Sequence, residues 1–170
     1  MADTWREPTA VLPLRWGSHV PRSLAGLSLI VGGAIGLQAA APHILYFLLA
    51  GTVAHSAGWA IMPAKGWRRL VVAVPCIAGI WVLLTSPQSV WALVIPFIAW
   101  LLVRHRPARS YVTVVFVVAA GVLLPQFFSE YRDMVPALAV MTVVLVGSAW
   151  LARLIAVSAR PPGELPAEFR

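Results

Sequence analysis

The stretch that decides the fold is residues 24–62, LAGLSLIVGGAIGLQAAAPHILYFLLAGTVAHSAGWAIM, which carries no charged residue over 39 positions. As one helix it would be about 58 Å long, roughly twice the thickness of the hydrocarbon core of a bilayer. The chain must therefore turn back once within it. Pro42 supplies the break, because proline removes a helix hydrogen bond and suits the first turn of the next helix. The stretch predicts two membrane-spanning helices joined near residues 39–43.

The composition of the whole chain agrees with a membrane protein. Of its 170 residues, 60% are hydrophobic and 11% are charged, against roughly half and a quarter in soluble domains. The mean hydropathy is +0.83. A soluble domain of this size needs more polar side chains than this to cover its surface. The single cysteine, Cys76, excludes an intramolecular disulfide and a cysteine-based metal site.

Two further pairs of spans follow the first. Residues 70–103 are again uncharged, over 34 positions, and the sequence Ser-Pro-Gln-Ser at 86–89 predicts a turn in their middle. Residues 111–128 and 135–157 form the third pair, joined by residues 129–134. The sequence therefore predicts six spans.

Basic residues test the orientation of these spans independently of hydropathy. Twelve of the 13 lie before the first span, between the second and third, between the fourth and fifth, or at the end of the sixth: Arg6, Arg15, Arg22, Lys65, Arg68, Arg69, Arg104, Arg106, Arg109, Arg153, Arg160 and Arg170. The opposite connections hold only Arg132. By the positive-inside rule, the side with twelve basic residues is cytoplasmic.

The predicted fold class is thus an all-α integral membrane protein with six transmembrane helices, arranged as three helical hairpins, and with both termini cytoplasmic. We expect a cytoplasmic N-terminal segment at residues 1–22, a six-helix transmembrane domain at residues 23–157 and a cytoplasmic proline-rich tail at residues 158–170. Twelve of the 13 basic residues are arginine and asparagine is absent. This bias is typical of a GC-rich bacterial genome, so the expected location is the bacterial plasma membrane, the inner membrane where there are two.

The one ionisable side chain near the middle of a span is His55. Thr52, Ser56 and Trp59 lie at helical spacings on the same face. One hypothesis is a functional site, either a ligand or haem contact or a proton-responsive switch. The other is a neutral histidine that hydrogen-bonds a neighbouring helix. We favour the second, because no other span carries a histidine or a carboxylate at this depth, and we expect no cofactor and no metal.

Small residues recur every four positions in the first two spans. Such stripes let two helices approach closely, and they comprise Ser28, Gly32, Gly36 and Ala40 in the first span and Ala50, Ala54 and Gly58 in the second. We expect the two spans to pack on each other through these residues. A contact with another subunit through the same stripes is the alternative.

The absence of chemistry-bearing residues limits the function. No Asp or Glu lies within any span, whereas ion-coupled carriers and proton relays place carboxylates there. No phosphate-binding glycine loop, zinc spacing or nucleophile elbow occurs. We therefore expect no enzyme and favour a non-catalytic subunit or accessory component of a membrane complex. The alternative is a conduit for small solutes or lipids, or a substrate-binding permease subunit.

The partners expected from this reading follow from the same features. Anionic lipids should lie at the cytoplasmic face, because that face carries the arginines. A second membrane protein or further copies of the chain should cover exposed helix faces. Nucleic acid is not an expected partner, because the basic residues occur only in short groups between long apolar stretches.

The predicted topology can be tested with single cysteines. In a chain whose Cys76 has been replaced, cysteines at Ser86 and Ser129 should react with an impermeant thiol reagent in intact cells, because both lie in external turns. A cysteine at Ser158 should not react. Labelling at Ser158 from outside would contradict the six-span topology.

Overall fold

A computed structural model describes residue 9 and residues 17–39, 45–64 and 66–158. These residues form six α-helices: α1 His19–Gln38, α2 Leu45–Ile61, α3 Gly66–Val82, α4 Val94–Val103, α5 Val114–Phe127 and α6 Met134–Ser158. Short 3-10 helices lead into the last three: η2 Pro87–Leu93, η3 Ala108–Thr113 and η4 Tyr131–Asp133. The described part of the chain contains no strand, which confirms the all-α prediction there.

The helix boundaries differ from the expected ones in two places. Helix α1 begins at His19, so Arg22 lies in its first turns and not ahead of the span. The turn of the second hairpin was expected at residues 86–89 but comes just before Pro87. Pro87 is the first residue of η2, a position that suits its fixed φ. Most of the turn at 39–43, together with residues 1–8, 10–16 and 159–170 of the tails, lies outside the described residues.

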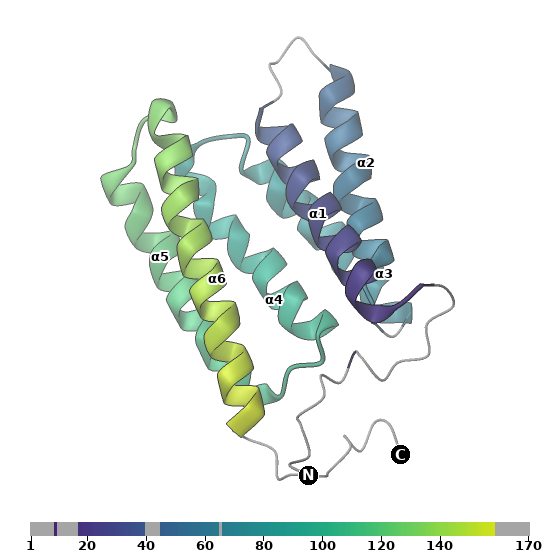
Figure 1. Ribbon diagram of the computed structural model, residues 1–170. Coiled ribbons are helices and arrows are strands. Elements are labelled where there is room, and N and C mark those ends of the chain that lie inside the picture. The colour runs from purple at the N-terminus through teal and green to yellow at the C-terminus, as the bar shows by residue number, and fades with distance from the viewer. Residues whose placement is uncertain (1–8, 10–16, 40–44, 65, 159–170) are drawn as a thin grey trace.

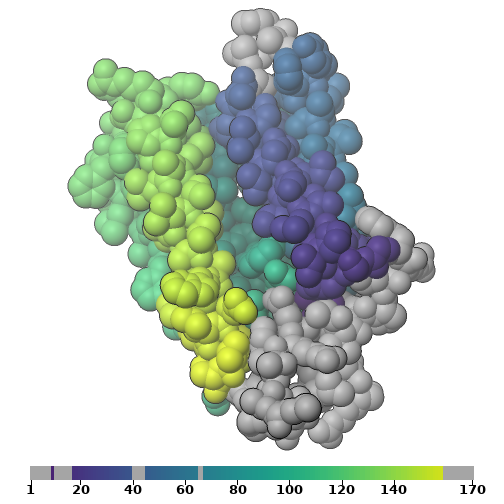
Figure 2. All heavy atoms as spheres, viewed as in Figure 1, coloured from purple at the N-terminus to yellow at the C-terminus, as the bar shows by residue number. Residues whose placement is uncertain are grey.

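The helices are arranged as three neighbouring hairpins (Figure 1). Helices α1 and α2 lie side by side at one edge, α5 and α6 at the other, and α3 and α4 between them. The start of α1 and the end of α6 lie toward the same end of the bundle. Between α1 and α6 the surface is hollowed into a furrow, with α4 at its floor (Figure 2).

Three segments are long and apolar enough to cross a membrane: His19–Gln38, Ala108–Phe127 and Tyr131–Ser158. Leu45–Ile61 and Pro87–Val103 are shorter apolar helices. Less than a third of each long segment is buried within the protein, and large apolar side chains such as Val143 and Leu154 are exposed along α6. Apolar surface of this extent is compatible with a lipid environment.

Two apolar clusters hold the hairpins together. The first joins Leu37 of α1 to α3, η2, α4, α5 and α6, with Leu101, Val117 and Met141 fully buried. The second joins α1, α2, α3 and α4 around Ile30, Trp59, Met62, Cys76 and Val103. Helices α3 and α4 contribute to both clusters, so the middle hairpin connects the two outer ones.

Helices α1 and α2 meet at two pairs of glycines. A Cβ built on Gly33 would lie 2.5 Å from the backbone nitrogen of His55 and 2.6 Å from the oxygen of Gly51. A Cβ on Gly58 would lie 2.7 Å from the oxygen of Gly26. No real Cβ fits at such distances, so these positions require glycine in order for the two backbones to come this close.

Arginines bind the last backbone carbonyls of α2 and α4. The Nε of Arg22 donates to the oxygen of Ile61 (2.6 Å), and Arg69 donates to the oxygen of Ala60 (3.0 Å). Arg68 donates to the oxygen of Leu102 at the end of α4 (3.1 Å). The final carbonyls of a helix have no partner within it and carry partial negative charge. A guanidinium both donates hydrogen bonds to these carbonyls and neutralises their charge.

The glycine contact predicts opposite results for two neighbouring residues. Gly33→Ala should destabilise the protein by about 1–3 kcal/mol, because the new methyl group overlaps α2 backbone atoms. Gly32→Ala, which meets nothing within 4 Å, should leave stability unchanged or raise it by up to about 1 kcal/mol through helix propensity. Thermal unfolding in detergent measures both. Equal effects of the two substitutions would contradict the observed contact face.

Candidate functional site

The four polar residues predicted on α2 take part in two separate groups of hydrogen bonds, one around His55 and Trp59 and one around Thr52 and Ser56. His55 and Trp59 are each 1% exposed. The Nδ1 of His55 lies 2.9 Å from the backbone oxygen of Ile30 in α1, and the indole Nε1 of Trp59 donates to the Nε2 of His55 (3.1 Å). This group connects α2 to α1.

These partners define the protonation of His55. An indole N–H is only a donor, so the Nε2 of His55 accepts; a carbonyl oxygen is only an acceptor, so Nδ1 carries the proton and donates it to Ile30. The imidazole is therefore the neutral Nδ1–H tautomer, an assignment that rests on its partners. Both ring nitrogens are occupied, which leaves neither available to a metal or to haem iron in this arrangement.

The close approach of the helices explains how His55 reaches this carbonyl. The oxygen of Ile30 belongs to the face of α1 that contains Gly26 and Gly33, and the backbone of His55 itself lies against Gly33. Side chains larger than hydrogen at these glycines would hold α2 away from α1. The hydrogen bond therefore depends on the glycine contact described above.

Thr52 and Ser56 form the second group. The Oγ1 of Thr52 donates to the oxygen of Leu48 (2.7 Å), and the Oγ of Ser56 donates to the oxygen of Thr52 (2.6 Å). Both are bonds to the preceding turn of the same helix, a common way to satisfy a hydroxyl in an apolar environment. The indole of Trp81 on α3 donates to the Oγ1 of Thr52 (3.1 Å), so this group connects α2 to α3.

The arrangement is suited to holding helices together. Each of the four polar side chains has a protein partner: a carbonyl, a ring nitrogen or a hydroxyl. No group of three or more His, Cys, Asp or Glu that could hold a metal ion occurs among the described residues. The geometry therefore supports the structural hypothesis for His55 over the ligand hypothesis.

The small-residue stripe is placed differently from the expectation. Ser28 and Gly32 are exposed, and a Cβ on Gly36 would come no closer than 4.0 Å to Gly51. Ala50 is exposed and Ala54 half-buried, and Ala40 lies outside the described residues. Of the predicted set, Gly58 alone among the described members is buried against α1. The expectation that the stripe makes the contact between α1 and α2 is wrong for Ser28, Gly32 and Ala50.

The residues that do make the contact carry a different sequence signal. Gly26 and Gly33 are seven residues apart in α1, and Gly51 and Gly58 are seven residues apart in α2. Seven residues correspond to two turns of helices that pack at a shallow angle, as in coiled coils. The matched spacing of seven in both spans could have identified the contact, whereas the spacing of four selected another face of α1.

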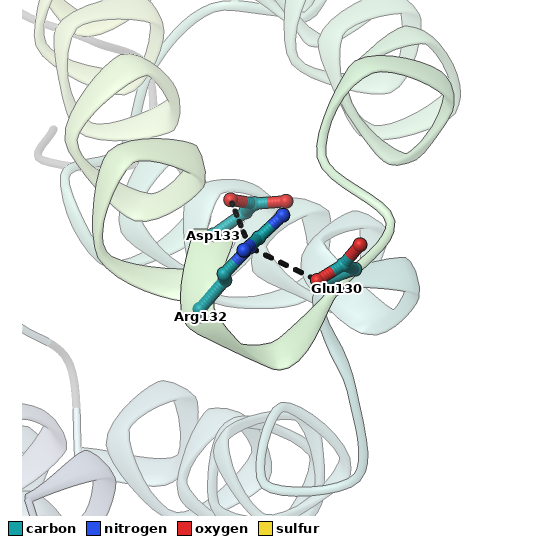
Figure 3. A network of polar contacts seen from close by, with 3 residues as sticks. All are labelled: Glu130, Arg132 and Asp133. Carbon is teal, nitrogen blue, oxygen red and sulfur yellow. Dashed lines mark ion pairs between the residues drawn. The ribbon is translucent and has the colours of Figure 1, made fainter.

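The connection before α6 holds the described acidic residues. Arg132 lies 2.9 Å from Glu130 and 4.0 Å from Asp133 (Figure 3). The side chains of Arg132 and Glu130 are 78% and 61% exposed, so these ion pairs contribute little to stability. Both carboxylates pair with Arg132, an arrangement that is common in a solvated turn.

Comparisons with protein-family models, with curated proteins and with solved structures find no match for this chain.

The structural role of His55 predicts a coupling with Trp59. His55→Leu should destabilise the protein by about 1–3 kcal/mol, because the Trp59 N–H and the Ile30 carbonyl each lose a buried partner. His55→Gln should retain most of the stability, since an amide offers both a donor and an acceptor.

A double-mutant cycle separates this coupling from simple loss of packing. Trp59→Phe removes the orphaned N–H, so the effect of His55→Leu should be smaller in the Trp59→Phe background by about 0.5 kcal/mol or more. Chemical unfolding in detergent measures all four proteins. Strict additivity of the two substitutions would contradict a role for the bond between them.

Proposed function

We propose that the protein is a multi-pass protein of the bacterial plasma membrane whose six helices all cross the bilayer, with both termini in the cytoplasm. We further propose that it is a non-catalytic subunit, which packs through the outward face of α1 against another membrane protein or a second copy of itself. A catalytic role is not proposed, because Thr52, His55 and Ser56 are each hydrogen-bonded to a backbone carbonyl.

The observation that carries this proposal is the outward face of α1. Its opposite face is occupied by α2 through Gly26 and Gly33. Ser28 and Gly32, which were expected to contact α2, are exposed, and a Cβ on Gly32 would meet nothing within 4 Å. The helix therefore carries small residues on a second side that no described part of the chain covers.

The physical reason for a protein partner is the weakness of apolar attraction between helices in lipid. Lipid tails are as apolar as leucine, so helices associate in membranes through close packing of backbones at small residues. Leu24, Val31 and Ile35 are exposed beside the small residues, at 59%, 47% and 63%. A helix that packed on Ser28 and Gly32 would also contact these apolar side chains.

The alternative is a conduit for small solutes or lipids, or a substrate-binding permease subunit. The feature that favours it is the furrow between α1 and α6 (Figure 2). A solute that binds there should raise the unfolding temperature of the isolated monomer, whereas the subunit hypothesis requires an assembly whose integrity depends on α1.

Three leucine substitutions test the proposal. Gly32→Leu should lower the fraction of protein in the assembly at least tenfold, about 1.4 kcal/mol, while the monomer keeps its unfolding temperature. Gly147→Leu is the matched control: it is an exposed helical glycine on α6, again with nothing within 4 Å, and should keep the assembly. Gly33→Leu should disrupt the fold itself.

The measurement is native mass spectrometry of the protein purified from its host in mild detergent. A wild-type protein that is monomeric under these conditions, or a Gly32→Leu protein that assembles as well as the Gly147→Leu control, would contradict the proposed role of α1.

A further inference from the structure

The end of α6 is joined to η3 by a buried hydrogen bond. The Oγ of Ser110 donates to the backbone oxygen of Ala152 (2.9 Å), and both residues are fully buried. Arg109 and Arg153 are the sequence neighbours of these two residues, and both are exposed. The bond therefore anchors the backbones that carry two exposed arginines at one junction of the bundle, next to the yellow end of α6 in Figure 1.

No described acidic residue neutralises these two arginines. The acidic side chains in the described part of the chain are Glu130 and Asp133, which pair with Arg132. Asp133 directly precedes α6, so it lies about 30 Å from the level of Arg153 along the helix axis. The described part of the chain thus leaves a locally positive site at the junction of η3 and α6.

The depth of the junction matches a lipid headgroup. Helix α6 has 25 residues, about 37 Å in length, and exceeds the roughly 30 Å of a hydrocarbon core by about five residues. Arg153 lies five residues before its end. Trp150, 65% exposed, lies one turn earlier, and tryptophan favours the boundary between hydrocarbon and headgroups.

The surface around Arg153 is apolar as well as basic. Leu151, Leu154 and Val157 are exposed on the last turns of α6, at 37%, 50% and 39%, and these turns are open on the face shown in Figure 2. A ligand that fits must therefore combine an anionic group with hydrocarbon. A phospholipid has this combination, whereas an acidic peptide would leave the apolar side chains uncovered.

We propose that Arg109 and Arg153 bind the phosphate of an anionic phospholipid. Guanidinium groups form paired hydrogen bonds to phosphate oxygens, and the acyl chains lie along the exposed apolar side chains of α6. The inference rests on the membrane location proposed above and is independent of any partner on α1. Selectivity for a lipid with net negative charge follows from two arginines at one headgroup.

The test measures lipid binding to the purified full chain by native mass spectrometry. The probes are phosphatidylglycerol, phosphatidylcholine of the same chain length, and inorganic phosphate. Wild-type protein should bind phosphatidylglycerol at least tenfold more tightly than phosphatidylcholine and should retain no inorganic phosphate. Arg109→Gln with Arg153→Gln should weaken phosphatidylglycerol binding at least tenfold and leave phosphatidylcholine binding unchanged.

Two further variants keep the test decisive. Arg132→Gln removes one arginine at the other end of α6 and should bind phosphatidylglycerol like the wild type. Arg109→Lys with Arg153→Lys retains the charge without the paired geometry and should show an intermediate affinity. Because it keeps both positive charges on long side chains, it remains informative if the glutamine pair fails to fold.

Three results would overturn the proposal: equal affinity of wild type and the glutamine pair for phosphatidylglycerol, equal affinity of the wild type for the two lipids, or tight binding of inorganic phosphate alone. A protein that fails to enter the membrane fraction would instead contradict the proposed membrane location, so the two failures are distinguishable.

Discussion

The contact between the backbones of α1 and α2 at two glycine pairs determines the surroundings of His55 and Trp59 in the middle of α2. Because a Cβ on Gly33 would lie within 2.6 Å of two α2 backbone atoms, the helices are as close as backbones permit. That closeness brings the carbonyl of Ile30 within 2.9 Å of the His55 ring. His55 then accepts from Trp59, and Trp59 fills the second apolar cluster. The absence of a side chain at Gly33 thus determines the positions of His55 and Trp59.

The ends of the helices are governed by a second constraint, the unpaired carbonyls that every helix leaves at its C-terminus. Helices α2 and α4 end on the side of the bundle where α1 and α3 begin, and arginines from α1 and α3 donate to their last carbonyls. The positive-inside rule describes where basic residues occur in a membrane protein. In this protein Arg22, Arg68 and Arg69 also have a local function, since they donate to the last backbone carbonyls of α2 and α4. The arginines from which the orientation is predicted therefore also stabilise the ends of helices.

The positions of the helices could be predicted from the sequence, but the faces through which they pack on one another could not. Long uncharged stretches interrupted by proline and by charged connections define the helix positions to within a few residues, because hydropathy over about 20 residues is a strong signal. The face of α1 was misassigned because the run Gly32-Gly33-Ala34-Ile35-Gly36 contains small residues on several sides of the helix. Which side faces α2 depends on the glycines of α2 and on the packing angle, neither of which periodicity in one helix reveals. Arg22 was assigned to a solvated segment for a similar reason: its carbonyl partner, Ile61, is 39 residues away in the chain.

The candidate site shows the same division. The spacing of Thr52, His55, Ser56 and Trp59 correctly places the four on α2 within reach of one another, because helical geometry fixes neighbours three and four residues apart. Their partners Ile30 and Trp81 belong to other helices and were beyond a one-helix argument. These partners decide the chemistry, since they occupy the ring nitrogen and the hydroxyl that a ligand would need.

Helix α1 carries small residues on two faces. Gly26 and Gly33 lie on the face that packs against α2, and Ser28 and Gly32 lie on an exposed face. Glycine in a helix costs about 1 kcal/mol relative to alanine, and at Gly33 the close approach of α2 offsets that cost. At Gly32 no described residue does so, because nothing lies within 4 Å of the position. Gly147 shares this property, but Gly32 has the exposed Ser28 one turn before it, so small residues occupy two successive turns on this side of α1. Small residues on successive turns let a second helix approach closely in lipid, and Ser28 and Gly32 lie on a side of α1 that α2 does not cover.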